Sequence, residues 1–220
     1  MAAWADAITE KKAELIRKAL DAVVLVADTS AAVPSTISEA TASAGLVVPT
    51  GFDPLGWHSD DGLTWGREVE NVDITSHGSV DPTRSDIQRI TSTLQVTCQE
   101  TNLQTLGLSL GMDLDSVTPP TSGEVKLDEP SRPKSKVYRV LGLSVDDSDN
   151  GEIYIGRLFA RAKITEQGEQ TWSDGDEAMV RQLTFQAYQD STAGFAVRHF
   201  FGGPGWRALL TDMGFPAATP

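Results

Sequence analysis

Two neighbouring runs of alternating apolar and polar residues constrain the fold of this 220-residue chain most strongly. In the first run, Val72 and Ile74 alternate with polar residues. In the second, the apolar residues between 90 and 98 share one phase. A period of two is typical of strands with one buried face. Residues 78–83 between the runs have the Gly, Asp and Pro content of a turn, so we expect an antiparallel hairpin.

Short apolar runs with β-branched residues predict further strands at residues 22–27, 136–145, 152–164, 181–188 and 194–201. The apolar phase changes at Gly156, which predicts a bulge, and residues 60–62 are expected to form a turn. Short helices are predicted at residues 3–20, at 101–106 with a stop at Gly107, and at 205–213. The expected fold is mainly β: an antiparallel β-sandwich or barrel with a short flanking helix, an N-terminal helix and arm, and a C-terminal helix.

Composition divides the chain into a body and two ends. Residues 1–51 hold the first helix, the first strand and an arm rich in Ala, Ser, Thr and Pro, which is either ordered or flexible. Residues 52–201 account for the β domain, and a Pro-rich loop at 111–134 interrupts it. Residues 202–220 form the C-terminal helix and arm. Neither the first arm nor the Pro-rich loop can build a core by itself.

Charge and residue usage exclude several classes of function. The chain has 31 acidic and 18 basic residues, a formal charge of −13, which argues against a protein that grips nucleic-acid phosphates. The single cysteine, Cys98, excludes an intramolecular disulfide, and three scattered histidines make a metal site improbable. No apolar run reaches the roughly 18 residues of a membrane span, so we expect no membrane insertion and a soluble product made in the cytoplasm.

One motif suggests catalysis. Residues 107–111 (GLSLG) match the G-x-S-x-G string of a serine hydrolase, in which a strand–turn–helix bend exposes the nucleophile. Here the string follows a predicted helix and precedes the Pro-rich loop. The only later histidine, His199, lies inside a predicted strand. A hydrolase that uses Ser109 is therefore a remote alternative, because chance recurrence of Gly and Ser explains the match better.

The remaining constellations have structural explanations. Residues 146–151 (DDSDNG) resemble the start of a calcium loop, but the twelfth position is Arg157 rather than glutamate, so a hairpin turn is favoured over adventitious ion binding. Trp57 and Trp65 are expected to be core or interface aromatics. Cys98 shares the phase of the buried face, which predicts an inert thiol. We expect no enzyme, no cofactor and no metal.

Residues 55–65 (LGWHSDDGLTW) resemble a recurring segment of the major tail proteins of long, non-contractile-tailed bacteriophages. In that family an acidic strand, a turn, a Thr-rich strand and a Glu-x-Asn-containing helix follow. This chain has counterparts in that order, at residues 68–74, 78–84, 90–96 and 100–103. It departs from the family at residues 76–78, where SHG stands in place of the frequent WQG. The resemblance covers residues 22–110, and the remainder agrees by pattern alone.

The resemblance implies a tail-tube subunit with a β-sandwich similar to the type VI secretion tube protein. Such subunits form hexameric rings that stack into a channel for DNA during ejection. The partners implied are other copies of the chain, a tape measure protein, and tail-tip and terminator proteins, in a virion tail assembled in the host cytoplasm. A tail-tip or baseplate adaptor with the same fold, used in a single ring, is the alternative.

In a DNA-conducting tube, acidic walls would repel phosphate and let the genome slide. Solubility is an equally good explanation for the acidity. The candidate lumen-facing carboxylates, which lie on or beside predicted strands, are Glu68, Glu70, Asp73, Glu152 and Glu166. Strand alternation gives Glu68 and Glu70 one phase and Asp73 the opposite one.

Overall fold

The computed structural model describes residues 11–41, 43–132, 135–176 and 178–218. The elements of these residues follow in chain order: a 3₁₀ turn η1 (Ala13–Leu15), β1 (Asp21–Asp28), β2 (Asp53–Pro54), β3 (His58–Ile74), β4 (Arg84–Cys98), α2 (Leu103–Leu110), β5 (Tyr138–Asp146), β6 (Ile153–Gln167), β7 (Arg181–Tyr188), β8 (Val197–Gly202) and α3 (Pro204–Ala208). The mainly-β antiparallel fold with short helices is confirmed. No helix among the described residues has the length and apolar character needed to cross a membrane.

The described strands form one antiparallel sheet in the order β2-β1-β5-β6-β7-β4-β3, with β8 added beside β6. One edge of β6 changes partner along its length. Residues from Tyr154 to Phe159 pair with β8, and residues from Arg161 to Gln167 pair with β7. The register shift between β5 and β6 falls just past Phe159, so the bulge predicted at Gly156 is wrong. Gly156 itself stays in register with Leu143, and the irregularity lies where the partner changes.

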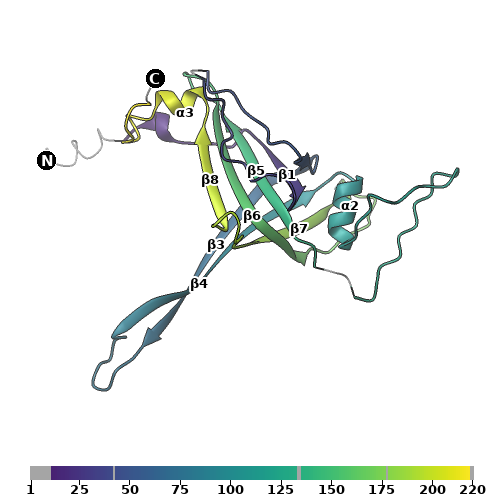
Figure 1. Cartoon of the computed structure of the whole chain (residues 1–220), viewed down its shortest axis with the longest axis horizontal. Coiled ribbons are helices and arrows are strands. Elements are labelled where there is room, and N and C mark those ends of the chain that lie inside the picture. The colour runs from purple at the N-terminus through teal and green to yellow at the C-terminus, as the bar shows by residue number, and fades with distance from the viewer. Residues whose placement is uncertain (1–10, 42, 133–134, 177, 219–220) are drawn as a thin grey trace.

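The sheet folds over so that its two ends share one core. Val24 of β1 and Val140 of β5 pack in the same cluster as Leu94 of β4 and Phe185 of β7. Figure 1 shows β3 and β4 crossing behind β6 and β8. This arrangement buries apolar side chains between the two halves of the sheet, as expected for a sandwich or barrel.

Trp65 of β3 packs between the two halves of the sheet. Its ring meets Phe159 edge-to-face, with centroids 5.5 Å apart and planes at 88°. Across from it stands Gly142 of β5, where a Cβ atom would lie 2.5 Å from the indole. The indole thus fills the space that the missing side chain leaves, and the prediction of Trp65 as a core aromatic is confirmed.

The other face of the sheet is covered by the arm that follows β1. Ile37 and Phe52 are buried there in a second apolar cluster. Arg139 of β5 holds the arm, because its buried guanidinium donates to the carbonyls of Thr29 and Ala31, both at 2.9 Å. The described residues of this arm thus pack against the sheet through buried side chains and the Arg139 hydrogen bonds.

The predicted hairpin is confirmed and is longer than the pattern indicated. β3 and β4 pair from His58 with Cys98 out to Ile74 with Arg84. The turn predicted at residues 60–62 is wrong, since these residues lie inside β3 as part of a bulge between His58 and Leu63. Gly62 has φ +73°, and this left-handed conformation suits a bulge as well as a turn.

The helices differ from the predictions in their limits. α2 begins two residues late, because Asn102 caps it: its Oδ1 accepts from the Thr105 amide at 2.8 Å. The helix runs through the predicted stop at Gly107 and ends at Gly111, whose φ is 65°. α3 is shorter than residues 205–213. The predicted N-terminal helix is wrong for residues 11–20, which hold only the turn η1, and residues 3–10 lie outside the described residues.

Replacing Gly142 with alanine tests whether the Trp65 contact holds the halves together. The added Cβ would overlap the indole, so we expect the free energy of unfolding to fall by roughly 1–3 kcal/mol, the usual cost of overpacking a core. Gly175→Ala is the control, since its Cβ would meet nothing closer than 3.7 Å. Urea denaturation measures both variants. Equal stabilities would show that the contact is not tight.

Candidate self-association surface

The distal part of the β3–β4 hairpin projects from the body without cover (Figure 1). We call residues 67–91 the ribbon. No residue of the ribbon is buried. An isolated two-stranded ribbon is only marginally stable in water, and a third strand or a packing partner is normally required. The ribbon is therefore the segment of this chain that most needs a partner.

One face of the ribbon carries an exposed apolar stripe. Val69 pairs with Ile90, and Asn71 pairs with Ile87, on the face that continues from the core residue Trp65. A register shift next to Glu70 makes this possible, because it places Ile87 and Ile90, three residues apart, on the same face. Ile87 is 63% exposed and Ile90 47%. Val69, Ile87 and Ile90 are named the stripe below.

Besides the two-residue strand β2, two described strands of the sheet have open edges. Among the described strands, β3 pairs with β4 alone, and β8 pairs with β6 alone. The outer backbone groups of both strands are thus available to another chain. Proteins that remain monomeric usually protect such edges with short strands, prolines or inward-pointing charges. A β3 edge that runs from His58 to Ile74 has the length needed for pairing between subunits.

The predicted lumen-facing carboxylates divide between two faces and two regions. The alternation of β3 places Glu68 and Glu70 on the face opposite the stripe, and places Asp73 on the stripe's own face. Glu70 is paired with Arg89 across the ribbon, and this hydrogen bond raises the pKa of Arg89. Glu68 has no salt-bridge partner among the described residues, so it contributes most of that face's uncompensated negative charge.

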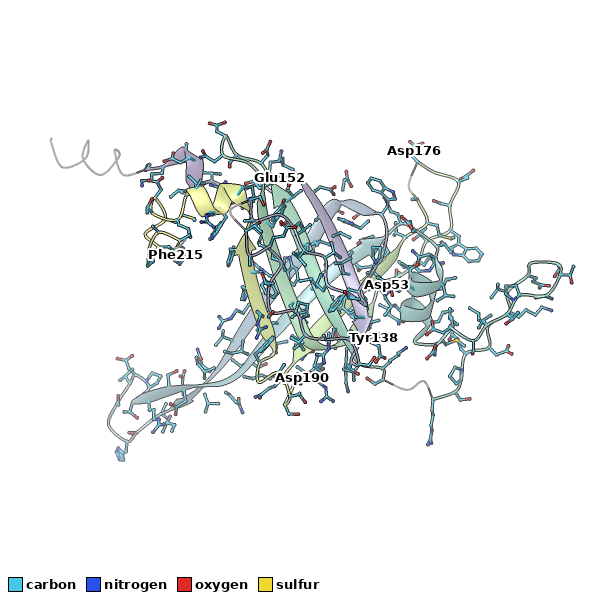
Figure 2. All side chains as sticks on the ribbon, turned by 45° about the horizontal axis from the view of Figure 1, so that its top comes forward. Asp53, Tyr138, Glu152, Asp176, Asp190 and Phe215 are labelled. Carbon is cyan, nitrogen blue, oxygen red and sulfur yellow. The ribbon has the colours of Figure 1, made fainter. Side chains whose placement is uncertain are left out.

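The other two candidates lie at opposite ends of β6. Glu152 precedes the strand (Figure 2) and accepts a hydrogen bond from the Tyr154 hydroxyl, which raises the pKa of Tyr154. Glu166 stands near the strand's far end. The structure thus brings Glu68 and Glu70 together and keeps Glu152 and Glu166 apart. Whether any of the five faces a channel remains a prediction.

The serine-hydrolase string at residues 107–111 and the calcium-loop string at residues 146–151 both have local structural roles. Ser109 lies in the last turn of α2, where its Oγ donates to the Leu106 carbonyl at 3.1 Å. The strand–turn–helix bend of a nucleophile elbow does not occur there, so that interpretation is wrong. Residues 147–152 link β5 to β6 as the predicted hairpin turn. At the end of β5, Asp146 is occupied by an ion pair with Arg17 at 3.3 Å.

The second tryptophan and the cysteine have different surroundings. Trp57 is 73% exposed, so it is not a core aromatic; it sits beside the bulge at the start of β3. Cys98 is fully buried in the main core, as its phase predicted. Burial raises the pKa of the Cys98 thiol to about 11. Across the described part of the chain, no three His, Cys, Asp or Glu side chains are placed to hold a metal ion.

Open sheet edges, an uncovered ribbon and an apolar stripe are features of a chain that associates with other chains. The family described as "Phage tail tube protein" matches residues 9–197, and this chain belongs to that family. It is therefore a structural component of a phage tail tube rather than an enzyme. The wider surface could not be predicted from the sequence, because only the fold shows that the stripe and the open edge belong to one uncovered hairpin.

Solved structures give weaker likenesses. A chain of the PVC sheath–tube complex of an extracellular contractile injection system is 8% identical, with 87% of this chain and 94% of that chain covered and a TM-score of 0.43. A chain of the SPP1 tail tube is 13% identical, with 83% and 77% covered and a TM-score of 0.34. An Hcp protein is 11% identical, with 81% and 98% covered and a TM-score of 0.33. No curated protein matches the chain.

The burial of Cys98 predicts its reactivity. At pH 8 a thiol with a pKa of about 11 is almost entirely protonated, and only the thiolate alkylates rapidly. We expect iodoacetamide to leave the native protein unmodified and to label it fully in urea, as measured by intact mass. Rapid labelling of the native protein would mean that this part of the core opens readily.

Proposed function

We propose that this chain is the repeating subunit of the tail tube of a long, non-contractile phage tail. Its copies form hexameric rings, and the rings stack into a channel that conducts DNA to the host. The uncovered stripe on an open-edged ribbon carries this proposal, because a subunit that always stood alone would expose apolar side chains and strand edges at a cost in solubility.

The ribbon's two faces fit two different surroundings. The stripe face is suited to a neighbouring subunit, since it presents Val69, Ile87 and Ile90. The opposite face carries Glu68 and Glu70 near the body, and Val72 and Ile74, which are exposed rather than buried, near the tip. Its acidic part is suited to the channel, where negative charge repels phosphate. In this arrangement Asp73 belongs to the subunit contact and not to the channel wall.

If the chain builds a tail tube, the other components of the tail are its further partners. A tape measure protein would occupy the channel during assembly in the host cytoplasm, and tail-tip and terminator proteins would close its ends. Double-stranded DNA would pass without being retained, in keeping with a net charge of −13. The tube needs no membrane insertion of this subunit. A tail-tip or baseplate adaptor built on the same fold is the second candidate, and it would form one ring that does not propagate.

The first test removes the stripe. Replacing Ile87 and Ile90 with serine is expected to abolish sedimentable tubes while leaving the subunit folded, because both side chains are exposed in the single chain. Val125→Ser is the matched control, since Val125 is also exposed but lies outside the ribbon. Ultracentrifugation with negative-stain microscopy measures the outcome. Single rings from the unaltered protein would favour the adaptor, and tubes from the serine variant would refute the role of the stripe.

The second test concerns the acidic face. Glu68→Lys with Glu70→Lys is expected to permit assembly but to slow DNA release, because each ring gains phosphate-binding charges, and added salt is expected to relieve the delay. Asp73→Lys is the comparison and is expected to affect assembly more than release. Ejection rates from particles with normal tails measure both. An unchanged rate in the double variant would mean that the acidity serves solubility alone.

A further inference from the structure

A cleft opens where the ribbon leaves the body, and we call it the wedge. Its walls come from β3–β4 on one side and from β6 and β8 on the other. The side chains that matter here are Trp65, Arg67, Arg157, Phe159, Val197 and His199. The stripe begins at its mouth, since Ile90 also lines it. The wedge and the stripe thus form one continuous surface that is apolar at its base.

The wedge is cationic in a strongly acidic chain. The Arg157 guanidinium lies 5.1 Å from the centre of the Trp65 ring, and Arg67 lines the same cleft. Neither arginine is within salt-bridge distance of a carboxylate among the described residues, although Arg17, Arg84, Arg89 and Arg139 all are. Burial and the charge of Arg157 lower the pKa of His199, which favours the neutral form of this imidazole. The positive charge of the wedge therefore comes from the two arginines. A guanidinium over an indole, with a second arginine lining the same cleft, is suited to an acidic, aromatic ligand.

A segment of that chemistry lies on another part of the same chain. The loop between β6 and β7 carries Trp172, which is 80% exposed, followed by Asp174 and Asp176. The tryptophan is held outward, since its Nε1 donates to Gln170 Oε1 at 3.2 Å and Gln170 in turn donates to the Val180 carbonyl. Tryptophan is enriched among the residues that contribute most to binding at protein interfaces.

The loop cannot fill the wedge of its own chain. Figure 2 shows Asp176 on the opposite side of the body from the ribbon. A contact between them must therefore join two copies. Because the two surfaces differ, the contact is heterologous, and repetition of such a contact closes a ring or continues a stack. The chain itself supplies both halves of the charge complementarity.

We propose that residues 168–176 of one copy insert into the wedge of a second copy. Trp172 packs at the apolar base, and Asp174 and Asp176 pair with Arg67 and Arg157. This inference rests on the proposed function only in requiring self-assembly. It names the segment of the neighbouring subunit that meets the root of the ribbon. It also supplies carboxylates for two arginines that form no salt bridge among the described residues, and an apolar contact for the exposed ring of Trp172.

Charge exchange tests the pairing. Arg67→Glu with Arg157→Glu, and separately Asp174→Lys with Asp176→Lys, are each expected to raise the concentration needed for assembly by about tenfold or more. The variant that carries all four changes is expected to recover most of the loss, because the charges are again complementary. Arg161→Glu is the control, since Arg161 lies exposed on β6 outside the wedge. Sedimentation measures assembly, and circular dichroism of the unassembled subunit verifies folding.

Trp172→Ala provides a test that does not touch the core. Its side chain is exposed, so folding is expected to be unchanged while assembly weakens, and Phe215→Ala is the control at an exposed aromatic outside the wedge and the ribbon. If the unaltered protein assembles and both the Trp172 and the Asp174/Asp176 variants assemble equally well, this inference is wrong and the tube proposal stands. If the unaltered protein never assembles, the tube proposal itself fails. Normal assembly of the arginine variant with lost binding of a short DNA duplex would instead assign the wedge to phosphate.

Discussion

The packing of Trp65 against Gly142 determines where this fold ends and where its exposed surface begins. The indole occupies the space of an absent side chain on β5 and meets Phe159 of β6 edge-to-face. This contact closes the sheet over its main core. Beyond it β3 and β4 have nothing to pack against, so they continue as a free ribbon. The ribbon, the stripe and the wedge therefore all depend on one aromatic contact between strands far apart in sequence.

The opposite face of the sheet is closed within the same chain. Arg139 donates to two carbonyls of the arm and to the Ala160 carbonyl at 2.7 Å, and it pairs with Asp190 at 3.2 Å. A buried guanidinium is tolerable because these acceptors replace its water. Apolar side chains on both faces of the sheet are thus buried by segments of the same chain. The ribbon, in contrast, has no buried residue and leaves Val69, Ile87 and Ile90 exposed, as a subunit of a larger assembly requires.

Period-two alternation predicted the hairpin, the core position of Cys98, the limits of β7, and the common phase of Glu68 and Glu70. The predictions that relied on single glycines failed, because glycine occurs in turns and at helix ends but also in bulges and at close packing contacts. Gly62 adopts a left-handed conformation in a bulge instead of a turn. Gly107 stays helical because it packs against the loop that follows, where a Cβ would lie 3.1 Å from the Met112 carbonyl. The wedge could not be predicted, because Arg67 and Arg157 are brought together only by the closing of the sheet.

Hydrogen exchange of the ribbon tests most directly whether its exposed surface is an interface between subunits. In the unassembled protein, the outward amides of β3 beyond Trp65 are expected to exchange fast, because no strand protects that edge. In tubes or rings made from the same protein, their exchange is expected to slow by about a hundredfold or more, while β5, which is buried in both states, changes little. Equal exchange of the ribbon before and after assembly would contradict the account, since subunits would then associate without covering it.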